Sequence, residues 1–397
     1  MTVILHQKSK TTIKMMKTIF LILFVLFSIV EISAQEIARV KLKELDSQFF
    51  SFKRPVLIYT PEGYDECTQS DYDVIYVFDA QVRSHFDEVH SMLHFGVQQP
   101  NNDRQYIVVG VASPSHLEMD YCRNNDFLPV PRHWEMETPY YGNLNQFKQF
   151  LTKELIPYIN NNYRTSGHTL AIGHSLGASF VLDAMTTDDM FDDVIAISPN
   201  LAWDEDYYSA KIMNFDFTHS RPHFIYMTMA NECLDNDILG FPNQWRESWN
   251  EVKKFLSDKS LPKNITFKID EMPAYSHNEV VLPAHLLTLK QYAEYRHEPV
   301  FNDDKLYPVH IELSGSSVDS DVYVTGNQPA LCDWDPNGIK MTVVNDTTRA
   351  LDINLRLPAE FKFTKGSWDY CYYIINGDSG NIRISSPEKA KKYYKTN

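Results

Sequence analysis

The hydrophobic pattern of the chain changes character near residue 300. Before this point, short continuous apolar runs alternate with stretches in which apolar residues recur every three or four positions. The first pattern is typical of strands buried on both faces of a sheet, and the second of amphipathic helices. Strands are predicted at 54–60, 73–79, 105–111, 170–172, 193–198, 223–228 and 265–269, and helices at 143–162, 176–186 and 246–257. This alternation predicts a mostly parallel α/β sheet with helices on both faces.

Beyond residue 301 the pattern becomes that of short strands in which apolar and polar residues alternate. Gly, Asn, Asp and Pro fill the turns, which is typical of a small antiparallel β-sandwich. These strands are predicted at 309–313, 322–325, 341–344, 351–356 and 361–364. Pro299 and the polar stretch 302–305 indicate a linker. We therefore expect an α/β domain at 35–299 and a β-sandwich domain at 300–397.

Residues 1–34 have the pattern of a secretory signal peptide. Four lysines precede an apolar run at 19–30, and the small residues Ser33 and Ala34 follow it. The run is short for a bilayer-spanning helix. We therefore expect cleavage near Ala34 and a secreted or periplasmic protein without stable membrane insertion. An uncleaved membrane anchor is the alternative.

The charge and the cysteines narrow the classes of partner. The formal net charge is −15, and removal of residues 1–34 takes away four Lys and one Glu, which leaves −18. Nucleic-acid binding needs clustered Lys and Arg, so no nucleic-acid partner is expected. The five cysteines form no C-x-x-C pair, and neither a metal nor an organic cofactor is expected. Export permits disulfides, for which Cys332 and Cys371 are one candidate pair.

One apolar run ends at a serine between two glycines. Residues 170–180 read LAIGHSLGASF, in which Gly173, Ser175 and Gly177 match the G-x-S-x-G pattern. In this pattern a strand turns sharply into a helix, the glycines avoid a clash of Cβ atoms, and the serine oxygen is exposed above the sheet. The strand predicted before the motif and the helix predicted after it fit this context. We therefore expect Ser175 to be a catalytic nucleophile, with a loop serine between packing glycines as the alternative.

A serine nucleophile needs an acid and a base, which follow it along the chain in that order in this architecture. His277 lies between the last predicted strand of the domain and an apolar helix, where the base belongs. Glu232 is the first carboxylate after the sixth predicted strand, and Asp235 and Asp237 remain alternatives. We predict a triad of Ser175, His277 and Glu232. The alternative for His277 is an exposed loop histidine.

The predicted site also needs two backbone N–H groups that face the developing negative oxygen. One normally belongs to the residue after the nucleophile, which is Leu176. The other comes from the loop after an early strand, where we assign Gln81. Because only backbone atoms take part, this assignment depends on position and not on residue type.

Several longer segments of the chain resemble segments of one known family. Over about residues 40–295 the chain resembles the putative esterase family in the phrases DVIYVFDA, YIVVGV, FLTKELIPYINNNYRT, LAIGHSLGASFVLDAM, VIAISPN and SHNEV. That family includes esterase D, ferric enterobactin esterases, feruloyl and acetyl-xylan esterases and mycolyltransferases. The resemblance implies an α/β-hydrolase fold and the triad given above. Ala80 and Ala178 replace glycines found in many members. Arg123 and Asp126 match the family's R-x-x-D-x-x-P segment near the mouth of the site, where they contact substrate or pair with each other.

The C-terminal domain resembles the starch-binding-domain family. Residues 322–336 read VYVTGNQPALCDWDP, close to the family's V-x-V-x-G-N-x-x-x-L-G-x-W-x-P, with Cys332 in place of a glycine. Sugar rings present apolar faces that stack on exposed indoles. The resemblance thus implies a glycan partner, with Trp334 and Trp368 as its platforms. The alternative is a sandwich that packs against the catalytic domain, with both tryptophans structural.

Together these features favour an exported serine esterase that hydrolyses carboxylic esters. The attached module makes feruloyl or acetyl groups on carbohydrate the favoured substrates. A siderophore esterase of the enterobactin type and an acyltransferase are alternatives that would use the same residues. An alternative of another class is a non-catalytic glycan-binding protein, against which the intact Ser175–His277 pair argues.

Overall fold

The computed structural model describes residues 39–97, 104–116, 121–133, 141–219, 223–232, 244–258, 261–297, 301, 303–318, 320–377 and 381–397. The chain divides into two compact units, Met1–Val40 and Lys41–Asn397, and only the last two residues of the first unit are described. The predicted signal peptide therefore lies outside the described residues. Within the described ranges, none of the helices has the length and apolar character needed to cross a membrane.

An eight-stranded sheet forms the centre of the α/β region, in the order β1-β2-β4-β3-β5-β6-β7-β8. Its strands are β1 (Arg39–Leu45), β2 (Arg54–Thr60), β3 (Tyr72–Phe78), β4 (Tyr106–Val111), β5 (Thr165–His174), β6 (Asp193–Ile197), β7 (His223–Ala230) and β8 (Ile265–Met272). β2 pairs with β4 in the antiparallel sense, and every pair from β4 through β3 to β8 is parallel. β3 and β7 are buried along their whole length, because helices cover both faces. The predicted mostly parallel sheet is confirmed.

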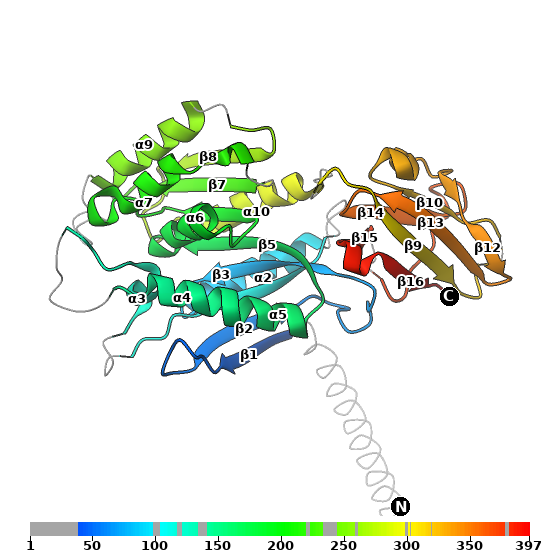
Figure 1. Ribbon diagram of the computed structural model, residues 1–397, viewed down its shortest axis with the longest axis horizontal. Helices are drawn as coiled ribbons and strands as arrows, with labels where there is room; N and C mark the ends of the chain where they lie inside the picture. Colours follow the sequence, from blue (N-terminus) through cyan, green and yellow to red (C-terminus); the bar gives the residue numbers. More distant parts are fainter. Residues whose placement is uncertain are drawn as a thin grey trace, which may run out of the picture. The chain divides into compact units, whose positions relative to one another are not determined.

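Helices cover both faces of this sheet (Figure 1). They are α2 (Arg83–Val97), α3 (Arg123–Phe127), α4 (Leu144–Phe150), α5 (Ile156–Asn162), α6 (Leu176–Asp188), α7 (Trp203–Asn214), α9 (Gln244–Asp258) and α10 (Val281–His297). α2 and α10 pack against each other on one face, and α3, α4, α6, α7 and α9 form a contiguous layer on the other. This arrangement confirms the predicted α/β-hydrolase type of fold.

The helix predicted at 143–162 is continuous but irregular. A π-helical turn, Leu151–Leu155, joins α4 to α5. Pro157 follows at the start of α5. Proline has no N–H to donate to the carbonyl of Lys153, so a regular α-helical ladder is interrupted there, and the wider turn occupies the point of interruption. The apolar stripe still reaches the core through Phe147, Phe150 and Leu155.

The C-terminal region consists of two four-stranded sheets. One has the order β11-β10-β14-β15 and the other β12-β13-β9-β16. The strands are β9 (Tyr307–Ser314), β10 (Tyr323–Gly326), β11 (Ile339–Lys340), β12 (Thr342–Asn345), β13 (Thr348–Leu355), β14 (Ala359–Thr364), β15 (Ile382–Ile384) and β16 (Lys391–Lys395). All pairs are antiparallel except β16 with β9. The two sheets share one hydrophobic core, as in a sandwich. The five strands predicted from alternation are present, whereas β11, β15 and β16 were not predicted.

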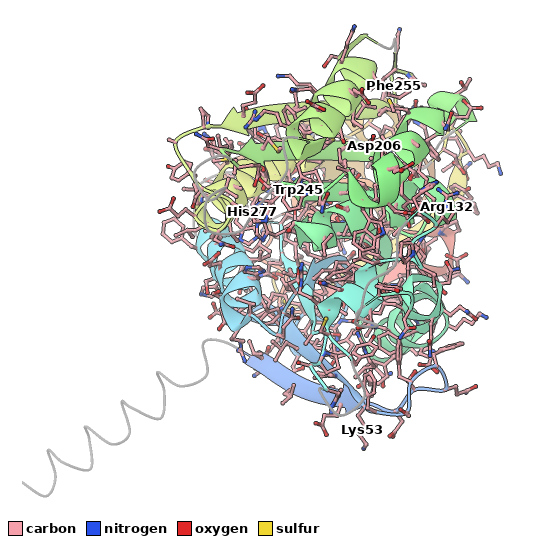
Figure 2. All side chains as sticks on the ribbon, turned by 90° about the vertical axis from the view of Figure 1, so that its left-hand side faces the viewer. Lys53, Arg132, Asp206, Trp245, Phe255 and His277 are labelled. Atoms are coloured by element: carbon pink, nitrogen blue, oxygen red, sulfur yellow. The ribbon has the colours of Figure 1, made fainter. Side chains whose placement is uncertain are left out.

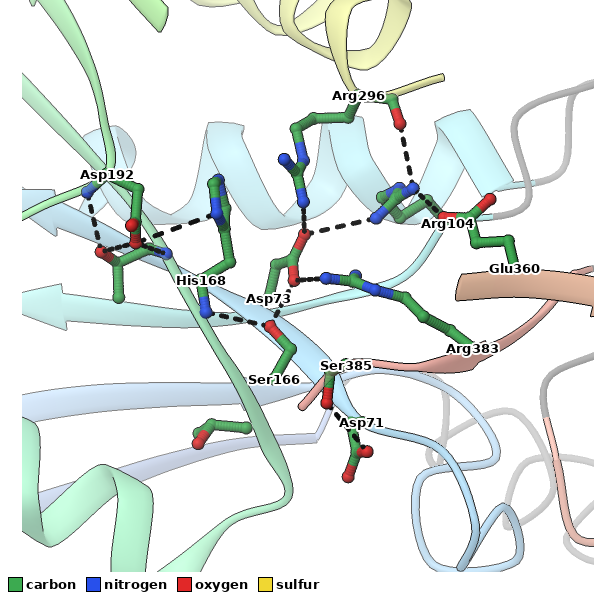
Figure 3. A network of polar contacts seen from close by, with 12 residues as sticks. Asp71, Asp73, Arg104, Ser166, His168, Asp192, Arg296, Glu360, Arg383 and Ser385 are labelled. Atoms are coloured by element: carbon green, nitrogen blue, oxygen red, sulfur yellow. Dashed lines mark hydrogen bonds and ion pairs between the residues drawn. The ribbon is translucent and has the colours of Figure 1, made fainter. Parts of the chain in front are cut away.

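A buried polar network joins residues of the C-terminal sheets to residues of the α/β sheet (Figure 3). Asp73 on β3 forms an ion pair with Arg383 of β15 at 2.7 Å and accepts a hydrogen bond from Arg296 of α10 at 3.0 Å. Arg104 lies 3.4 Å from the same carboxylate. A second carboxylate, Asp71, accepts hydrogen bonds from Ser385, Lys389 and Lys392. Both aspartates lie at or before the amino end of β3.

Candidate active site

The nucleophile motif forms the sharp turn that the glycines predict. Ser175 follows β5 directly and precedes α6, and its φ of 58° is unusual for a residue with a side chain. A Cβ on Gly173 would lie 2.3 Å from the carbonyl oxygen of Gly177, and a Cβ on Gly177 would lie 2.8 Å from Oδ2 of Asp79. Neither position therefore has room for a side chain. The N–H of Ser175 donates to Ile197 at 2.9 Å, which ties the turn to β6.

Ser175 lies in a pocket of about 590 Å³. Four of the predicted site residues line it together: Gln81, Arg123, Ser175 and His277. Glu232, Leu176 and Asp126 are not among the lining residues. In the part of the chain that the structure describes, no cluster of three or more His, Cys, Asp or Glu side chains is arranged to bind a metal ion. The lining includes the hydroxyl of Ser175 and the imidazole of His277, groups suited to nucleophilic and acid–base chemistry.

The predicted base and the favoured acid contact each other. Nδ1 of His277 lies 2.7 Å from Oε2 of Glu232, and both side chains are buried. This contact fixes the tautomer with the proton on Nδ1, which leaves Nε2 as a proton acceptor. The Ser175 hydroxyl and the His277 ring line the same pocket, and the hydrogen bond between such a pair commonly reaches its catalytic length only when substrate is bound. Asp235 and Asp237, the alternative acids, lie outside the described residues.

His174, the residue before the nucleophile, contacts the base from another direction. Its Nε2 donates a hydrogen bond of 2.8 Å to the backbone carbonyl of His277. The two ring centroids lie 4.6 Å apart, and the ring of Trp245, labelled beside His277 in Figure 2, lies 5.5 Å from that of His277. Burial lowers the pKa of His174 well below its usual value, with the neighbouring His277 adding to the effect. His174 is therefore neutral, which avoids a second positive charge beside the base. The sequence analysis did not identify this residue, although it lies within the nucleophile motif.

The loop after β3 holds Gln81 by its side chain. Its Nε2 donates to Oδ1 of Asp79 at 2.8 Å, and its Oε1 accepts from the backbone N–H of Ser113 at 2.9 Å. Among the described residues, no acceptor is found for the backbone N–H of Gln81. Leu176 is the first residue of α6, where the N–H has no acceptor within the helix. The backbone N–H groups of Gln81 and Leu176 stay the donors predicted for the oxyanion hole.

Arg123 and Asp126 take separate roles, and the predicted substrate contact of Asp126 is wrong. Arg123 lines the pocket, but its guanidinium forms two hydrogen bonds with Asp79, of 2.6 and 2.5 Å. Asp126 is fully buried, and Arg54 binds it at 2.7 and 3.1 Å together with the hydroxyl of Tyr121. A carboxylate without exposed surface does not reach substrate. The alternative, a pair between Arg123 and Asp126, is not formed either.

The two tryptophans predicted as glycan platforms differ in exposure. Trp368 is 47% exposed, and Tyr370 and Tyr373 nearby are each 65% exposed. Trp334 is only partly exposed and has a φ of 66°. Cys332, which stands in place of a glycine in the starch-binding-domain pattern, has a φ of 60°, a conformation that glycine adopts readily. Cys332 and Cys371 are both free thiols, so the candidate disulfide is absent.

Comparisons with known proteins agree with this fold. The family model described as "Putative esterase" matches residues 47–266, which is more than half of the chain. An IroE-like serine hydrolase from Shewanella oneidensis has a TM-score of 0.54 and 23% identity, over 64% of this chain and 80% of that one. BES protein from Bacillus cereus has a TM-score of 0.52 and 21% identity, over 63% and 93%. Siderophore hydrolase EstA from Aspergillus nidulans has a TM-score of 0.52 and 15% identity, over 66% and 96%. No curated protein matches this chain.

Proposed function

The chain belongs to the putative esterase family and is a serine esterase, and we propose that Ser175, His277 and Glu232 form its catalytic triad. The observation that carries this assignment is the 2.7 Å contact between His277 Nδ1 and Glu232, beside the pocket that also holds Ser175. The buried carboxylate orients the ring and stabilises its charged form.

In the proposed reaction, His277 Nε2 takes the proton of the Ser175 hydroxyl while Oγ attacks the ester carbonyl carbon. The negative oxygen of the tetrahedral intermediate accepts hydrogen bonds from the N–H groups of Gln81 and Leu176. The intermediate collapses as the C–O bond to the alcohol breaks, and His277 gives its proton to the leaving oxygen. A water molecule then attacks the acyl group, again with His277 as base, and the acid is released as Ser175 regains its proton.

We propose that the substrates are esters on carbohydrate, such as feruloyl or acetyl esters. The charge of the pocket supports neutral substrates over polyanionic ones such as iron-bound catecholate siderophores. The described lining residues include one Arg or Lys side chain, that of Arg123, and Asp79 neutralises it. Glu88 and Glu279 also line the pocket, and hydrogen bonds from Ser276 lower the pKa of Glu279, so it is ionised at neutral pH. This excess of negative charge repels anions.

We further propose that residues 1–34 direct export, that residues 35–299 form the catalytic domain, and that residues 300–397 form a glycan-binding module. The exposure of Trp368 supports the last assignment, because a flat exposed ring suits a sugar face. Retention on insoluble starch or xylan, compared between wild type and the variants Trp368→Ala and Trp334→Ala, tests this role. Equal retention of all three proteins would refute a platform role for both residues.

Labelling with a fluorophosphonate, followed by turnover of a panel of aryl and carbohydrate esters, tests the catalytic assignment. We expect wild type to label and to hydrolyse esters, and Ser175→Ala to do neither. If Ser175→Ala keeps full turnover, Ser175 is not the nucleophile. If wild type neither labels nor hydrolyses any ester, the alternative hypothesis, a non-catalytic glycan-binding protein, is favoured instead.

Phenyl acetate and 4-sulfophenyl acetate compare a neutral with an anionic ester on the same enzyme. We expect kcat/KM to be on the order of tenfold lower for the anionic ester at low salt, and the gap to narrow at 0.5 M salt because salt screens charges. Glu279→Gln should narrow it as well. Equal kcat/KM values for the two esters would contradict the preference for neutral substrates.

A further inference from the structure

We propose that Asp79 is a positioning residue that holds the oxyanion hole in its active geometry, acting through the side chains of Gln81 and Arg123. The inference rests on the proposed function, since it takes the N–H of Gln81 as an oxyanion donor. Neither the sequence motifs nor the family resemblance assigns a role to this carboxylate.

Asp79 occupies a position that a carboxylate does not adopt without support. It is the first residue after β3, its φ is 60°, and only 2% of its surface is exposed. Strained conformations of this kind persist only where neighbouring contacts enforce them, and they gather at functional sites. A buried carboxylate also needs donors to compensate for its lost hydration. Gln81 and Arg123, which line the pocket, supply the supporting contacts and the hydrogen-bond donors.

Three hydrogen bonds converge on this carboxylate. Arg123 donates from Nε to Oδ1 at 2.6 Å and from Nη2 to Oδ2 at 2.5 Å. Gln81 donates from Nε2 to Oδ1 at 2.8 Å, and the other end of its amide accepts from Ser113 at 2.9 Å. The amide of Gln81 is therefore held between Asp79 and the residues after β4. Because the side chain is fixed at both ends, the backbone N–H of the same residue has a defined direction.

The second glycine of the nucleophile motif makes room for this carboxylate. A Cβ on Gly177 would lie 2.8 Å from Oδ2 of Asp79. Gly177 lies one residue beyond Leu176, the other proposed donor. The carboxylate of Asp79 thus lies against the turn that carries one oxyanion donor and binds the side chain of the residue that carries the other. Contact with both loops couples their positions.

The charge of Arg123 has a definite place in this arrangement. An unpaired carboxylate next to the site would repel the oxyanion that forms during the reaction. The bidentate pair cancels that charge, and Arg123 also approaches the carbonyl of His174 at 3.4 Å. Arg123 therefore acts on the oxyanion hole through Asp79, which binds the Nε and Nη2 groups of its guanidinium.

Two variants test the proposal by separate routes. Asp79→Asn keeps a residue type that tolerates positive φ but removes the charge and part of the contact set. Gln81→Met removes both side-chain contacts and leaves the backbone N–H in place. For each variant we expect kcat to fall by about 10- to 100-fold, less than for loss of a donor itself, with KM changed less than threefold. Asp87→Asn is the matched control: it breaks an exposed Arg–Asp pair with Arg83 on the neighbouring α2 and should leave kcat unchanged.

A transition-state analogue separates positioning from a merely structural effect. An aryl trifluoromethyl ketone forms a hemiketal oxyanion with a serine hydrolase, so its Ki reports on the oxyanion hole. We expect its Ki to rise in parallel with the loss of kcat in both variants, while inhibition by the product acid is unchanged.

Three results have distinct meanings. Wild-type kcat and Ki in Gln81→Met would overturn the proposal, and this variant serves if Asp79→Asn does not fold. Equal weakening of the analogue and of the product acid would also overturn it, since that pattern indicates general disruption. Failure of wild type to react with fluorophosphonate would reject the proposed function itself. Loss of kcat in the variants, with wild type still labelled, leaves the proposed function intact.

Discussion

The network around Asp73 makes a quantitative prediction about stability. Asp73→Asn preserves the shape of the side chain and removes its charge. The carboxylate is 1% exposed and is surrounded by three guanidinium groups, of which Arg383 and Arg296 are themselves 8% and 4% exposed. The variant would leave these two arginines buried without their common partner.

The magnitude follows from the burial of the pair. Removing one partner of a buried ion pair costs about 3–5 kcal/mol, because the remaining charge is desolvated and uncompensated. Arg104 keeps a second partner, Glu360, so its share of the loss is smaller. We therefore expect D73N to lower the free energy of unfolding by about 3–5 kcal/mol, a large part of the stability of a typical domain.

Urea denaturation at pH 7, followed by tryptophan fluorescence and far-UV circular dichroism, measures this change. The control is Asp46→Asn, which breaks the exposed pair of Asp46 with Lys53 and should have little effect. If D73N is destabilised by less than about 1 kcal/mol more than this control, the reasoning is wrong, and the network is no better than a surface pair.

The same carboxylate predicts how stability depends on pH. Burial alone would raise the pKa of Asp73, but Arg383, Arg296 and Arg104, together with His168, hold it well below 3.8. A lowered folded-state pKa gives stability that is fully present above the unfolded value, near pH 4, and is lost as pH falls through the folded value. The stability difference between wild type and D73N should therefore be constant from pH 5 to 7 and shrink below pH 4.

Further predictions concern the site. Glu232→Gln should lower kcat on p-nitrophenyl acetate by roughly 10²- to 10⁴-fold, because the tautomer of His277 is no longer fixed, and wild-type activity in this variant would refute its role as the acid. His174→Phe should lower kcat by about tenfold, and His174→Gln should restore it, because an amide can still donate to the carbonyl of His277; equal rates in both would contradict a positioning role. Gly177→Ala should lower both thermal stability, by about 1–3 kcal/mol, and kcat, since its Cβ would meet Asp79; an unchanged melting temperature would argue against that clash.

The parts of the fold that could be predicted are those whose cause is local. β3 and β7 are apolar over their whole length because both faces are buried, and the sequence shows this directly. α7 was not predicted because Asp204, Glu205 and Asp206 in its first turn have positive φ, so the helix begins with a polar, irregular segment. β1 was not predicted because it is an edge strand with four consecutive exposed residues.

The site shows the same division between local and long-range causes. The sharp turn at Ser175 could be predicted because it depends on glycines next to Ser175 in the sequence. Asp126 was misassigned because its partner, Arg54, is 72 residues away and no local pattern connects them. The contact of His174 with His277 spans 103 residues and was missed for the same reason. Features set by local geometry are thus predictable from the sequence, whereas contacts between distant residues are not.

The two ends of β3 carry aspartates with different expected roles, one in stability and one in catalysis. Its central residues, 74–78, are all apolar and buried, so charged groups can be placed only at its two ends. Asp73 at the amino end binds arginines that belong partly to the C-terminal sheets, whereas Asp79, just past the carboxyl end, binds the loop of Gln81. Ligand sites of parallel sheets lie at the carboxyl ends of strands. We therefore expect D73N to lower stability with kcat unchanged for the folded enzyme, and D79N to lower kcat at conditions where both variants are fully folded. A loss of kcat in folded D73N equal to that in D79N would show that the two ends of the strand are not independent.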